Sequence, residues 1–430
     1  MFFLLQRKIF QDRYFIWIVE LLAGYNKTNN LMISENQRNN INFCQYLQQE
    51  CEKLKSQELW RILRRVESEQ SSRIIVEGKL YINFSSNDYL GLASHPALKE
   101  AAIKAVEKYG AGSGASRLIC GSMAIHHKLE ERLADFKQTE AALSFSSGYL
   151  TAIGTICSLV GKGDIVILDR LAHSCLIDAT RLSGAKLMVF HHNDCEHLES
   201  ILKRINNGRS ANQKALIVTE TVFSMDGDIA PLKQIVELKE KYGAWLMVDE
   251  AHATGIYKSG IVNSLGIGEA VELQMGTLGK AVGASGGFIC GKKVLIEYLI
   301  NKARSFIFTT APPPAASAAA LEGINIIDSD EGKMRAGMLL SLIDELKMSL
   351  LSADIDVSNI QSAIFPVILG SNEKATKVAK YLMENGIYIP AIRYPTVPKN
   401  SARLRITLTA NHNPEDVRLL TLALKSISGI

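Results

Sequence analysis

Short, nearly continuous apolar segments alternate with helical segments through the middle of this 430-residue chain, and this alternation limits the possible folds most strongly. Apolar strands separated by helices are typical of a mostly parallel sheet with helices on both faces. We predict strands at residues 141–145, 165–168, 187–190, 215–218 and 245–248. The helix before the last strand has Pro231 at its start and Gly243 after its end. The sequence therefore predicts an α/β fold, in which ligands bind at the carboxyl ends of the strands.

The segments on either side of this alternation predict further parts. Residues 42–70 have the apolar spacing of a helix, and residues 73–84 indicate a hairpin that turns at Glu77-Gly78. A proline-rich stretch at 311–315 predicts the turn into a long helix. Beyond residue 330, helices and strands at 364–369, 387–389 and 404–408 indicate a separate α+β lobe. We expect four regions: an appendage at 1–40, a helix and hairpin segment at 41–84, a large domain at 85–328 and a small C-terminal domain at 329–430.

The first 40 residues lack the pattern of a membrane or targeting segment. A membrane span needs roughly 18 uninterrupted apolar residues. Residues 1–24 are rich in Phe, Leu and Ile, but charged residues interrupt them, namely Arg7, Lys8, Asp12, Arg13 and Glu20. They also lack the order of basic, apolar and small residues that marks a cleaved signal. Our hypothesis is that these 40 residues form an appendage outside the fold and that the native protein starts at Met32.

Composition argues against several classes of function. The net charge is only +4, from 48 basic and 44 acidic side chains, which favours neither a nucleic acid nor a membrane as partner. The seven cysteines are odd in number and never form a C-x-x-C pair, which indicates reduced thiols in a cytoplasmic protein. The nine histidines include no H-E-x-x-H motif, so we expect no metal site.

One lysine among several glycines is the strongest chemical signal in the chain. Residues 276–287 read GTLGKAVGASGG and place Lys280 31 residues after Asp249, which follows a predicted strand. A poorly solvated lysine has a disfavoured ammonium form, so its amine can attack an aldehyde. An acid facing that lysine suits pyridoxal phosphate (PLP), whose ring nitrogen it would bind. The phosphate-loop pattern G-x-x-x-x-G-K-[ST] does not fit, because Gln274 replaces its first glycine and Ala281 follows the lysine.

Other candidate cofactor contacts also lie close after predicted strands. Gly148 and Tyr149 open a helix whose free amides favour phosphate, and Thr277 is placed to reach the same group. His252 is a candidate for the phenolic oxygen of the ring, and His173 for its face. The alternatives are a plain strand-to-helix turn, a helix cap and a loop histidine without a role. Their shared position after strands favours the cofactor interpretation.

Several longer motifs are highly specific. They lie at residues 83–92 (NFSSNDYLGL), 110–114 (GAGSG), 223–228 (FSMDGD), 248–252 (VDEAH) and 276–280 (GTLGK). Together they resemble the α-oxoamine synthases, PLP enzymes of fold type I, and the resemblance runs from about residue 45 to the end. It implies a large domain with a mostly parallel seven-stranded sheet, a smaller α+β C-terminal domain and a homodimer.

The resemblance also implies a role for each matching residue. Lys280 would bind PLP as a Schiff base, Asp249 would pair with the ring nitrogen and His173 would stack on the ring; these three would be the catalytic residues. The remaining cofactor contacts would be Gly148, Tyr149, Ser224, His252, Thr277 and, toward the neighbouring subunit's phosphate, Thr310. Substrate would contact His173 together with Arg61, Asn87, Thr396 and Arg405, the last by paired bonds to a carboxylate.

The residues at 391–398 and 403–410 are most similar to family members that condense L-alanine with a pimeloyl thioester in biotin biosynthesis. The acyl carrier would be coenzyme A or acyl carrier protein, a choice that the sequence leaves open. Two relatives that use glycine, 2-amino-3-ketobutyrate CoA ligase and 5-aminolevulinate synthase, are alternatives, because one methyl group is worth only about 1–3 kcal/mol of discrimination. An aminotransferase of the same fold and a binding module without catalysis are further alternatives. The joint presence of Lys280, Asp249, His252, His173 and Arg405 argues against the binding module.

Overall fold

The computed structural model describes residues 42–208, 210 and 212–427, so the predicted appendage at 1–40 lies outside the described residues. The chain forms two compact units, Met1–Trp60 and Arg61–Ile430. In the first unit, helix α2 (Phe43–Ser56) is capped by Asn42, whose side chain accepts hydrogen bonds from two backbone N–H groups. Within the described part of the chain, every helix is too short or too polar to cross a membrane.

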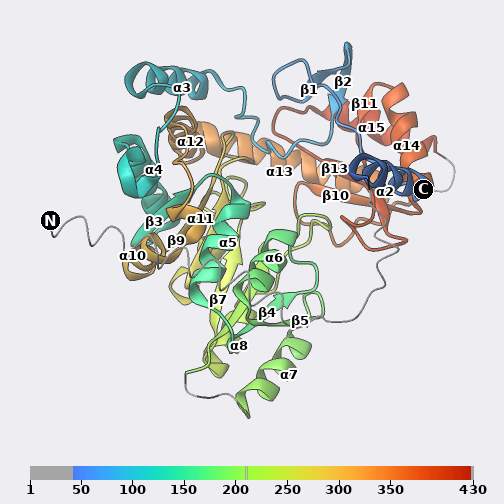
Figure 1. Ribbon diagram of the computed structural model, residues 1–430. Coiled ribbons are helices and arrows are strands. Elements are labelled where there is room, and N and C mark those ends of the chain that lie inside the picture. Colours follow the sequence, from blue (N-terminus) through green and yellow to red (C-terminus); the bar gives the residue numbers. More distant parts are fainter. Residues whose placement is uncertain (1–41, 209, 211, 428–430) are drawn as a thin grey trace, which may run out of the picture. The chain divides into compact units, whose positions relative to one another are not determined.

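The second unit is built on a seven-stranded sheet, in the order β3-β9-β8-β7-β6-β4-β5 (Figure 1). Strand β9 runs antiparallel to both of its neighbours, β3 and β8, and the other four pairs of the sheet are parallel, so the prediction of a mostly parallel sheet is confirmed. The five predicted strands are present to within two residues at each end. Strands β8 and β9, which contain glycines, were not predicted. The bounds are β3 (Ala141–Phe145), β4 (Ile165–Asp169), β5 (Lys186–Phe190), β6 (Ala215–Glu220), β7 (Trp245–Asp249), β8 (Leu273–Thr277) and β9 (Gly287–Gly291).

Apolar residues of this sheet alternate between two buried cores. In β6, Leu216 and Val218 belong to one core, whereas Ala215 and Ile217 belong to the other, as the period of two in a strand requires. Helices α5 (Gly148–Leu159), α6 (Ser174–Ser183), α10 (Lys293–Lys302) and α11 (Arg304–Ile307) pack in the first core. Helices α4 (Ala124–Lys137), α7 (Cys195–Asn206) and α8 (Leu232–Tyr242) pack in the second. Helices therefore cover both faces and leave the strand ends for the site.

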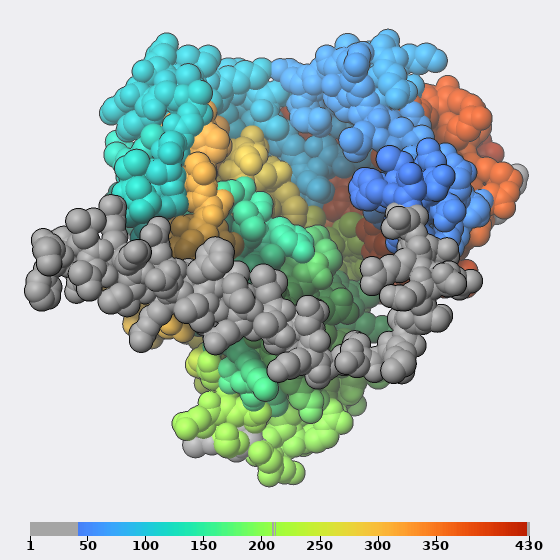
Figure 2. Space-filling model, viewed as in Figure 1, coloured from blue at the N-terminus to red at the C-terminus, as the bar shows by residue number. Residues whose placement is uncertain are grey.

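The predicted turn at 311–315 leads into helix α12 (Pro314–Ile327), which packs against α3 (Pro96–Tyr109) and α4. These three helices lie side by side in Figure 1, and α3 and α4 form the cyan surface of Figure 2 with orange atoms beside it. Short helical segments complete this part of the chain: η1 (Arg117–Gly121), α9 (Ile261–Ser264) and η2 (Gly268–Ala270).

Two smaller sheets lie outside the central one. The predicted hairpin is present as β1 (Arg73–Val76) and β2 (Lys79–Asn83), with positive φ angles at Glu77 and Gly78 as a tight hairpin turn requires. Strand β11 (Ile387–Tyr388) extends it in parallel, although more than 300 residues separate it from β2. The other sheet is antiparallel and is formed by β10 (Ile364–Gly370), β13 (Ala402–Thr407) and β12 (Ala391–Ile392). Helices α13 (Asp330–Leu351), α14 (Asn372–Glu384) and α15 (Pro414–Lys425) accompany them.

The prediction of a helix throughout 42–70 is wrong beyond residue 56. Glu58 has a φ angle of 57°, a left-handed conformation that ends the helix, and the backbone N–H of Leu59 bonds to the carbonyl oxygen of Leu54. Val66 instead forms an antiparallel bridge with Val76. The side chain of Leu63 is fully exposed. The apolar spacing therefore does not mark a continuous buried helix face.

Candidate active site

The central sheet brings together the side chains that follow its strands. Asp249 ends β7, Lys280 follows β8 and His173 caps the first turn of α6 after β4. Because β4, β6, β7 and β8 run parallel, their carboxyl ends meet at one edge of the sheet. His252 and Ser224 lie in the loops that leave the same edge, after β7 and β6 respectively.

Lys280 has a free and weakly basic amine. Its Nζ lies 2.8 Å from Nε2 of His252, and none of the ion pairs in the described structure includes it. Burial lowers the pKa of Lys280 to about 8, although the negative charges of Asp249 and Glu220 oppose this change. A substantial fraction of the amine is therefore neutral near physiological pH, as imine formation requires.

Asp249 is a buried carboxylate without a close cationic partner in the described chain. Its Oδ1 accepts a hydrogen bond from the backbone N–H of Ala251 at 2.8 Å. Burial raises the pKa of Asp249, and the positive charge of Lys280 partly offsets this rise. A protonated pyridine nitrogen would supply the cation that this carboxylate lacks, which is the fit expected for the PLP ring.

The beginning of α5 fits a phosphate group. Ser147 caps this helix, and its hydroxyl accepts from the backbone N–H of Leu150 at 3.2 Å. A Cβ atom on Gly148 would lie 3.7 Å from Cβ of Thr277, so the helix start and this threonine are adjacent. A Cβ on Gly287 would lie 2.6 Å from the backbone of Gly148, so only glycine permits this approach. The phenol of Tyr149 donates to Asp178 at 2.7 Å. The backbone amide of Tyr149 lies in the first turn of α5 and is available to an anion.

His173 is fixed by a residue that the sequence analysis missed. Its backbone N–H donates to Oε1 of Glu220 at 2.6 Å, and its Nδ1 lies 3.0 Å from the sulfur of Cys175. Glu220 ends β6 and is buried; burial, together with the charge of Asp249, raises its pKa to about 8. The signal that could have identified Glu220 was an acid as the last residue of an apolar strand. The same signal had identified Asp249.

Arg405 on β13 is buried at the junction of three segments. Its Nη1 donates to Oδ1 of Asn87 and to Oγ1 of Thr407, both at 3.0 Å, and its Nε donates to the carbonyl oxygen of Ser224 at 2.5 Å. The structure thus joins three predicted site residues: Asn87, Ser224 and Arg405. The side chain of Arg405 is buried, so this arginine does not lie on a solvated strand edge.

A hydrogen-bonded series connects Arg405 to Lys280 through Tyr89, to which the sequence analysis gave no role. The hydroxyl of Tyr89 lies 3.5 Å from Nη2 of Arg405 and 2.5 Å from Nδ1 of His252, and Nε2 of His252 contacts Lys280. Tyr89 belongs to the motif at 83–92, but its partners come from distant segments. The proposed carboxylate clamp and the proposed PLP lysine therefore belong to one network.

Arg61, Thr396 and Thr310 are among the predicted site residues that lie outside this hydrogen-bonded series in the described structure. Nη2 of Arg61 donates to Oγ1 of Thr396 at 3.2 Å, so these two predicted substrate contacts meet each other. Thr310 is exposed and forms an antiparallel bridge with Ser116. Their roles toward substrate and the neighbouring subunit stay predictions.

A half-buried histidine, His192, connects the two loops that carry His173 and Ser224. Nδ1 of His192 bonds Asp169 at 2.9 Å, and Nε2 bonds Asp228 at 2.7 Å. Burial disfavours its charge, but the hydrogen bonds to both carboxylates raise the pKa of His192 to about 10. A charged imidazole thus holds the loop after β4 to the loop after β6.

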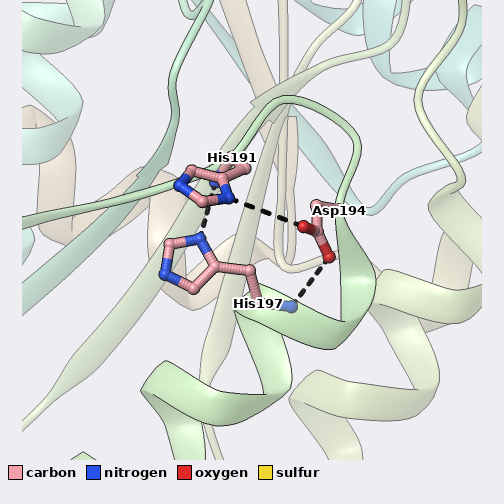
Figure 3. Close-up of side chains that lie close together, drawn as sticks. All are labelled: His191, Asp194 and His197. Carbon is pink, nitrogen blue, oxygen red and sulfur yellow. Dashed lines mark hydrogen bonds and ion pairs between the residues drawn. The ribbon is translucent and has the colours of Figure 1, made fainter.

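His191, Asp194 and His197 are the described residues whose side chains could together hold a metal ion, with ligand atoms within 4.8 Å of one another (Figure 3). Two of the three already have roles in the fold. Nδ1 of His197 accepts from the backbone N–H of His191 at 3.0 Å, and Asp194 caps helix α7 through the N–H of His197 at 2.8 Å. The helix start also disfavours a cation, so these contacts account for the cluster without a metal.

Comparison with known proteins identifies the family of this chain. The model of the class I and II aminotransferase family matches residues 79–424. The 8-amino-7-oxononanoate synthase of Geobacter sulfurreducens is 45% identical over 381 residues, which are 88% of this chain and 96% of that protein. The corresponding enzyme of Thermoanaerobacter pseudethanolicus is 43% identical over 388 residues, which are 90% of this chain and 96% of that protein.

Solved structures give the same result. Serine palmitoyltransferase of S. paucimobilis, with a PLP–myriocin aldimine bound, has a TM-score of 0.83 and 30% identity over 89% of this chain and 96% of that one. The 8-amino-7-oxononanoate synthase of Francisella tularensis has a TM-score of 0.68 and 29% identity over 80% of this chain and 97% of that one. The cofactor of this chain is PLP, and the predicted fold type I is confirmed. The chain therefore belongs to the class I and II aminotransferase family and, within it, to the PLP-dependent α-oxoamine synthases that include 8-amino-7-oxononanoate synthase.

Proposed function

We propose that this protein is an 8-amino-7-oxononanoate synthase, which condenses L-alanine with a pimeloyl thioester and releases carbon dioxide and the thiol. The observation that carries the proposal is the series Lys280–His252–Tyr89–Arg405, which places an amine of lowered pKa and a buried guanidinium in one network. An amino acid has the two groups that such a pair binds. Its amino end reacts at the cofactor, and its carboxylate pairs with the guanidinium.

In the proposed mechanism PLP supplies an electron sink for the carbanion formed at Cα of alanine. Lys280 removes the Cα proton, since its lowered pKa leaves a basic lone pair close to neutral pH. Arg405 holds the carboxylate until decarboxylation, with Asn87 and the carbonyl of Ser224 fixing the guanidinium. His173 donates to the oxygen of the thioester carbonyl as it gains charge, and Glu220 fixes the backbone of this histidine.

The direct test is the mass of the product formed from PLP, L-alanine and pimeloyl-coenzyme A. The expected product is 8-amino-7-oxononanoate, and a parallel reaction with pimeloyl-acyl carrier protein identifies the preferred carrier. Faster turnover with glycine would favour 2-amino-3-ketobutyrate CoA ligase or 5-aminolevulinate synthase. Conversion of the cofactor to its amine form by an amino donor alone would favour an aminotransferase.

We further propose that the enzyme is a cytoplasmic homodimer with the large domain at 85–328 and the small domain at 329–430. Apolar side chains near Thr310 are exposed in the single chain: Ile119 at 79% and Phe308 at 70%. A second subunit would cover these side chains and bring Thr310 toward its phosphate site. The cysteines are all unpaired thiols, which fits a reducing compartment. Light scattering of the purified enzyme tests the dimer, and a monomeric mass would contradict it.

A further inference from the structure

The hydroxyl of Tyr89 lies between three polar groups. It is 2.5 Å from Nδ1 of His252, 3.4 Å from Oδ1 of Asn87 and 3.5 Å from Nη2 of Arg405. The tyrosine is completely buried, and its ring meets the edge of the His252 ring at a centroid distance of 5.9 Å. The hydroxyl can therefore exchange hydrogen bonds only with these protein groups or a bound molecule.

The proton of Tyr89 has two candidate acceptors among these groups, Oδ1 of Asn87 and Nδ1 of His252. Arg405 can only donate, and Oδ1 of Asn87 already accepts from this arginine at 3.0 Å. Tyr89 has one proton, and its contact with Nδ1 of His252 is shorter by 0.9 Å (3.4 minus 2.5) than its contact with Asn87. We assign the tyrosine proton to the shorter contact, with Nδ1 of His252 as its acceptor.

The ionisation states agree with this direction. Burial raises the pKa of Tyr89, so the phenol keeps its proton, although Arg405 partly opposes the effect. Burial and the charges of Lys280 and Arg405 hold the pKa of His252 well below its usual value. A neutral imidazole that accepts at Nδ1 carries its proton on Nε2. In that tautomer the N–H lies 2.8 Å from Nζ of Lys280, whose neutral form can accept it through its lone pair.

We propose that Tyr89 is a positioning residue that fixes the tautomer of His252, so that Nε2–H donates to the amine of Lys280 and favours the neutral form of this amine. The hydrogen bonds then run in one direction from Arg405 through Tyr89 and His252 to Lys280. Once Lys280 has reacted with PLP, the same N–H is available to the phenolic oxygen that His252 is predicted to contact. Only this last consequence rests on the proposed function.

Replacing Tyr89 by phenylalanine isolates the hydroxyl, because it changes no charge near Lys280. The charged or titratable groups that face this amine are Asp249, Glu220, Arg405, Cys175, His173 and His252. All of them remain in Tyr89→Phe. Without the phenol, His252 is free to hold its proton on Nδ1 and to accept from the ammonium form of Lys280 through Nε2. The pKa of Lys280 should therefore rise.

The test uses the apoenzyme, so that it does not depend on turnover. The pKa of Lys280 is measured by competitive acetylation across pH, with mass spectrometry of the peptide that contains it. We expect Tyr89→Phe to raise this pKa by about one pH unit, the size expected for one net hydrogen bond. Tyr257→Phe is the matched control, because its hydroxyl donates at 2.6 Å to the carbonyl oxygen of Gln361, outside this network. The control should leave the pKa unchanged.

A second measurement needs only the wild-type protein, so it decides the question even if Tyr89→Phe does not fold. Nitrogen chemical shifts of histidines distinguish the two neutral tautomers. The proposal requires a proton on Nε2 of His252, with the signal assigned by its loss in His252→Gln. A proton on Nδ1 in the wild-type apoenzyme, or an unchanged pKa of Lys280 in a folded Tyr89→Phe variant, would overturn it. If the wild-type protein shows the expected tautomer but no condensation activity, this result would instead contradict the proposed function alone.

Discussion

Two lysines in this protein face acids that are neighbours in sequence, yet they differ in how they are paired. Lys137 lies at the end of α4, and its amine bonds the carboxylate of Glu250 and the carbonyl oxygen of Ser259. Both side chains of that ion pair are completely buried. Lys280 faces Asp249, but its nearest polar contact is the neutral ring of His252. Consecutive residues of an extended chain point to opposite sides, so one strand end serves two different lysines.

The difference shows what separates a structural lysine from a reactive one. The amine of Lys137 is engaged by the carboxylate of Glu250 and the carbonyl oxygen of Ser259, which hold it in a structural contact. Glu250 in addition accepts from the backbone N–H of Val262 at 2.9 Å, so this pair ties α4 to the chain after β7. Lys280 has no carboxylate this close among the described residues. The effect of burial therefore exceeds that of the acids around it, and the pKa of Lys280 is lowered. Both lysines are buried, and Lys280 differs in having no closed ion pair among the described residues, so that its amine has a lowered pKa.

Removal of the reactive lysine should have the largest effect. We expect Lys280→Ala to lower the condensation rate by about 10⁴-fold, the upper range for loss of a positioned acid–base group. Borohydride reduction of the PLP-loaded wild type should add the mass of the cofactor to the peptide that contains Lys280. Lys79→Ala, at an exposed position of β2, is the control and should keep full activity. A Lys280→Ala variant with near-normal turnover would remove this residue from the mechanism.

Breaking the structural pair should destabilise the fold without touching the reactive amine. Glu250→Gln leaves the charge of Lys137 buried and unpaired, so we expect the free energy of unfolding to fall by about 3–5 kcal/mol. Urea denaturation of the apoenzyme measures this change. The double variant Lys137→Met with Glu250→Leu should recover much of the loss, because it removes both charges. A loss below about 1 kcal/mol in Glu250→Gln would mean that the pair does not differ from a surface salt bridge.

The sequence predicted the strands better than the residues that hold the site together. Strands β4 and β6 have nearly continuous apolar residues, a local pattern that can be found without the fold. Strand β8 includes Gln274 and Gly276, which weaken that pattern. The helix predicted to residue 70 ends at Ser56 because a left-handed residue at Glu58 terminates it, and apolar spacing does not reveal backbone angles.

The same limit applied to the site. Lys280 and Asp249 could be found from their local surroundings, a glycine-rich segment and a strand end. Tyr89 and Glu220 could not be assigned roles in the same way, because their function depends on partners that are distant in sequence. Tyr89 meets His252 across 163 positions, and Glu220 meets His173 across 47. Physical chemistry gives the donors and acceptors of each side chain, but only the fold decides which of them meet.

A substitution at Arg405 tests whether the network that contains Lys280 also binds substrate. Arg405→Lys keeps the positive charge that lowers the pKa of Lys280 but loses the planar fork that bonds Asn87 and the carbonyl of Ser224 together. We expect the KM for L-alanine to rise by about 10- to 100-fold, corresponding to one or two lost hydrogen bonds to a charged group. Steady-state kinetics at saturating pimeloyl thioester measure it. Arg418→Lys on the exposed face of α15 is the control, and an unchanged KM in Arg405→Lys would exclude a carboxylate clamp.

The smallest expected effect concerns Asp249, which faces Lys280 but forms no close ion pair with it in the described structure. In the wild-type apoenzyme, the rate at which Lys280 captures PLP should rise with pH through about 8, because the neutral amine is the nucleophile and its fraction grows above the pKa. The charge of Asp249 raises that pKa, so Asp249→Asn should move the profile to lower pH, by about one unit. Absorbance after rapid mixing with PLP follows the capture. Glu250→Gln should move the midpoint less than Asp249→Asn does, because Glu250 is paired with Lys137. If the pH midpoint moved equally in both variants, the two acids would influence Lys280 to the same extent. The contrast between the ion-paired Lys137 and the unpaired Lys280 would then be wrong.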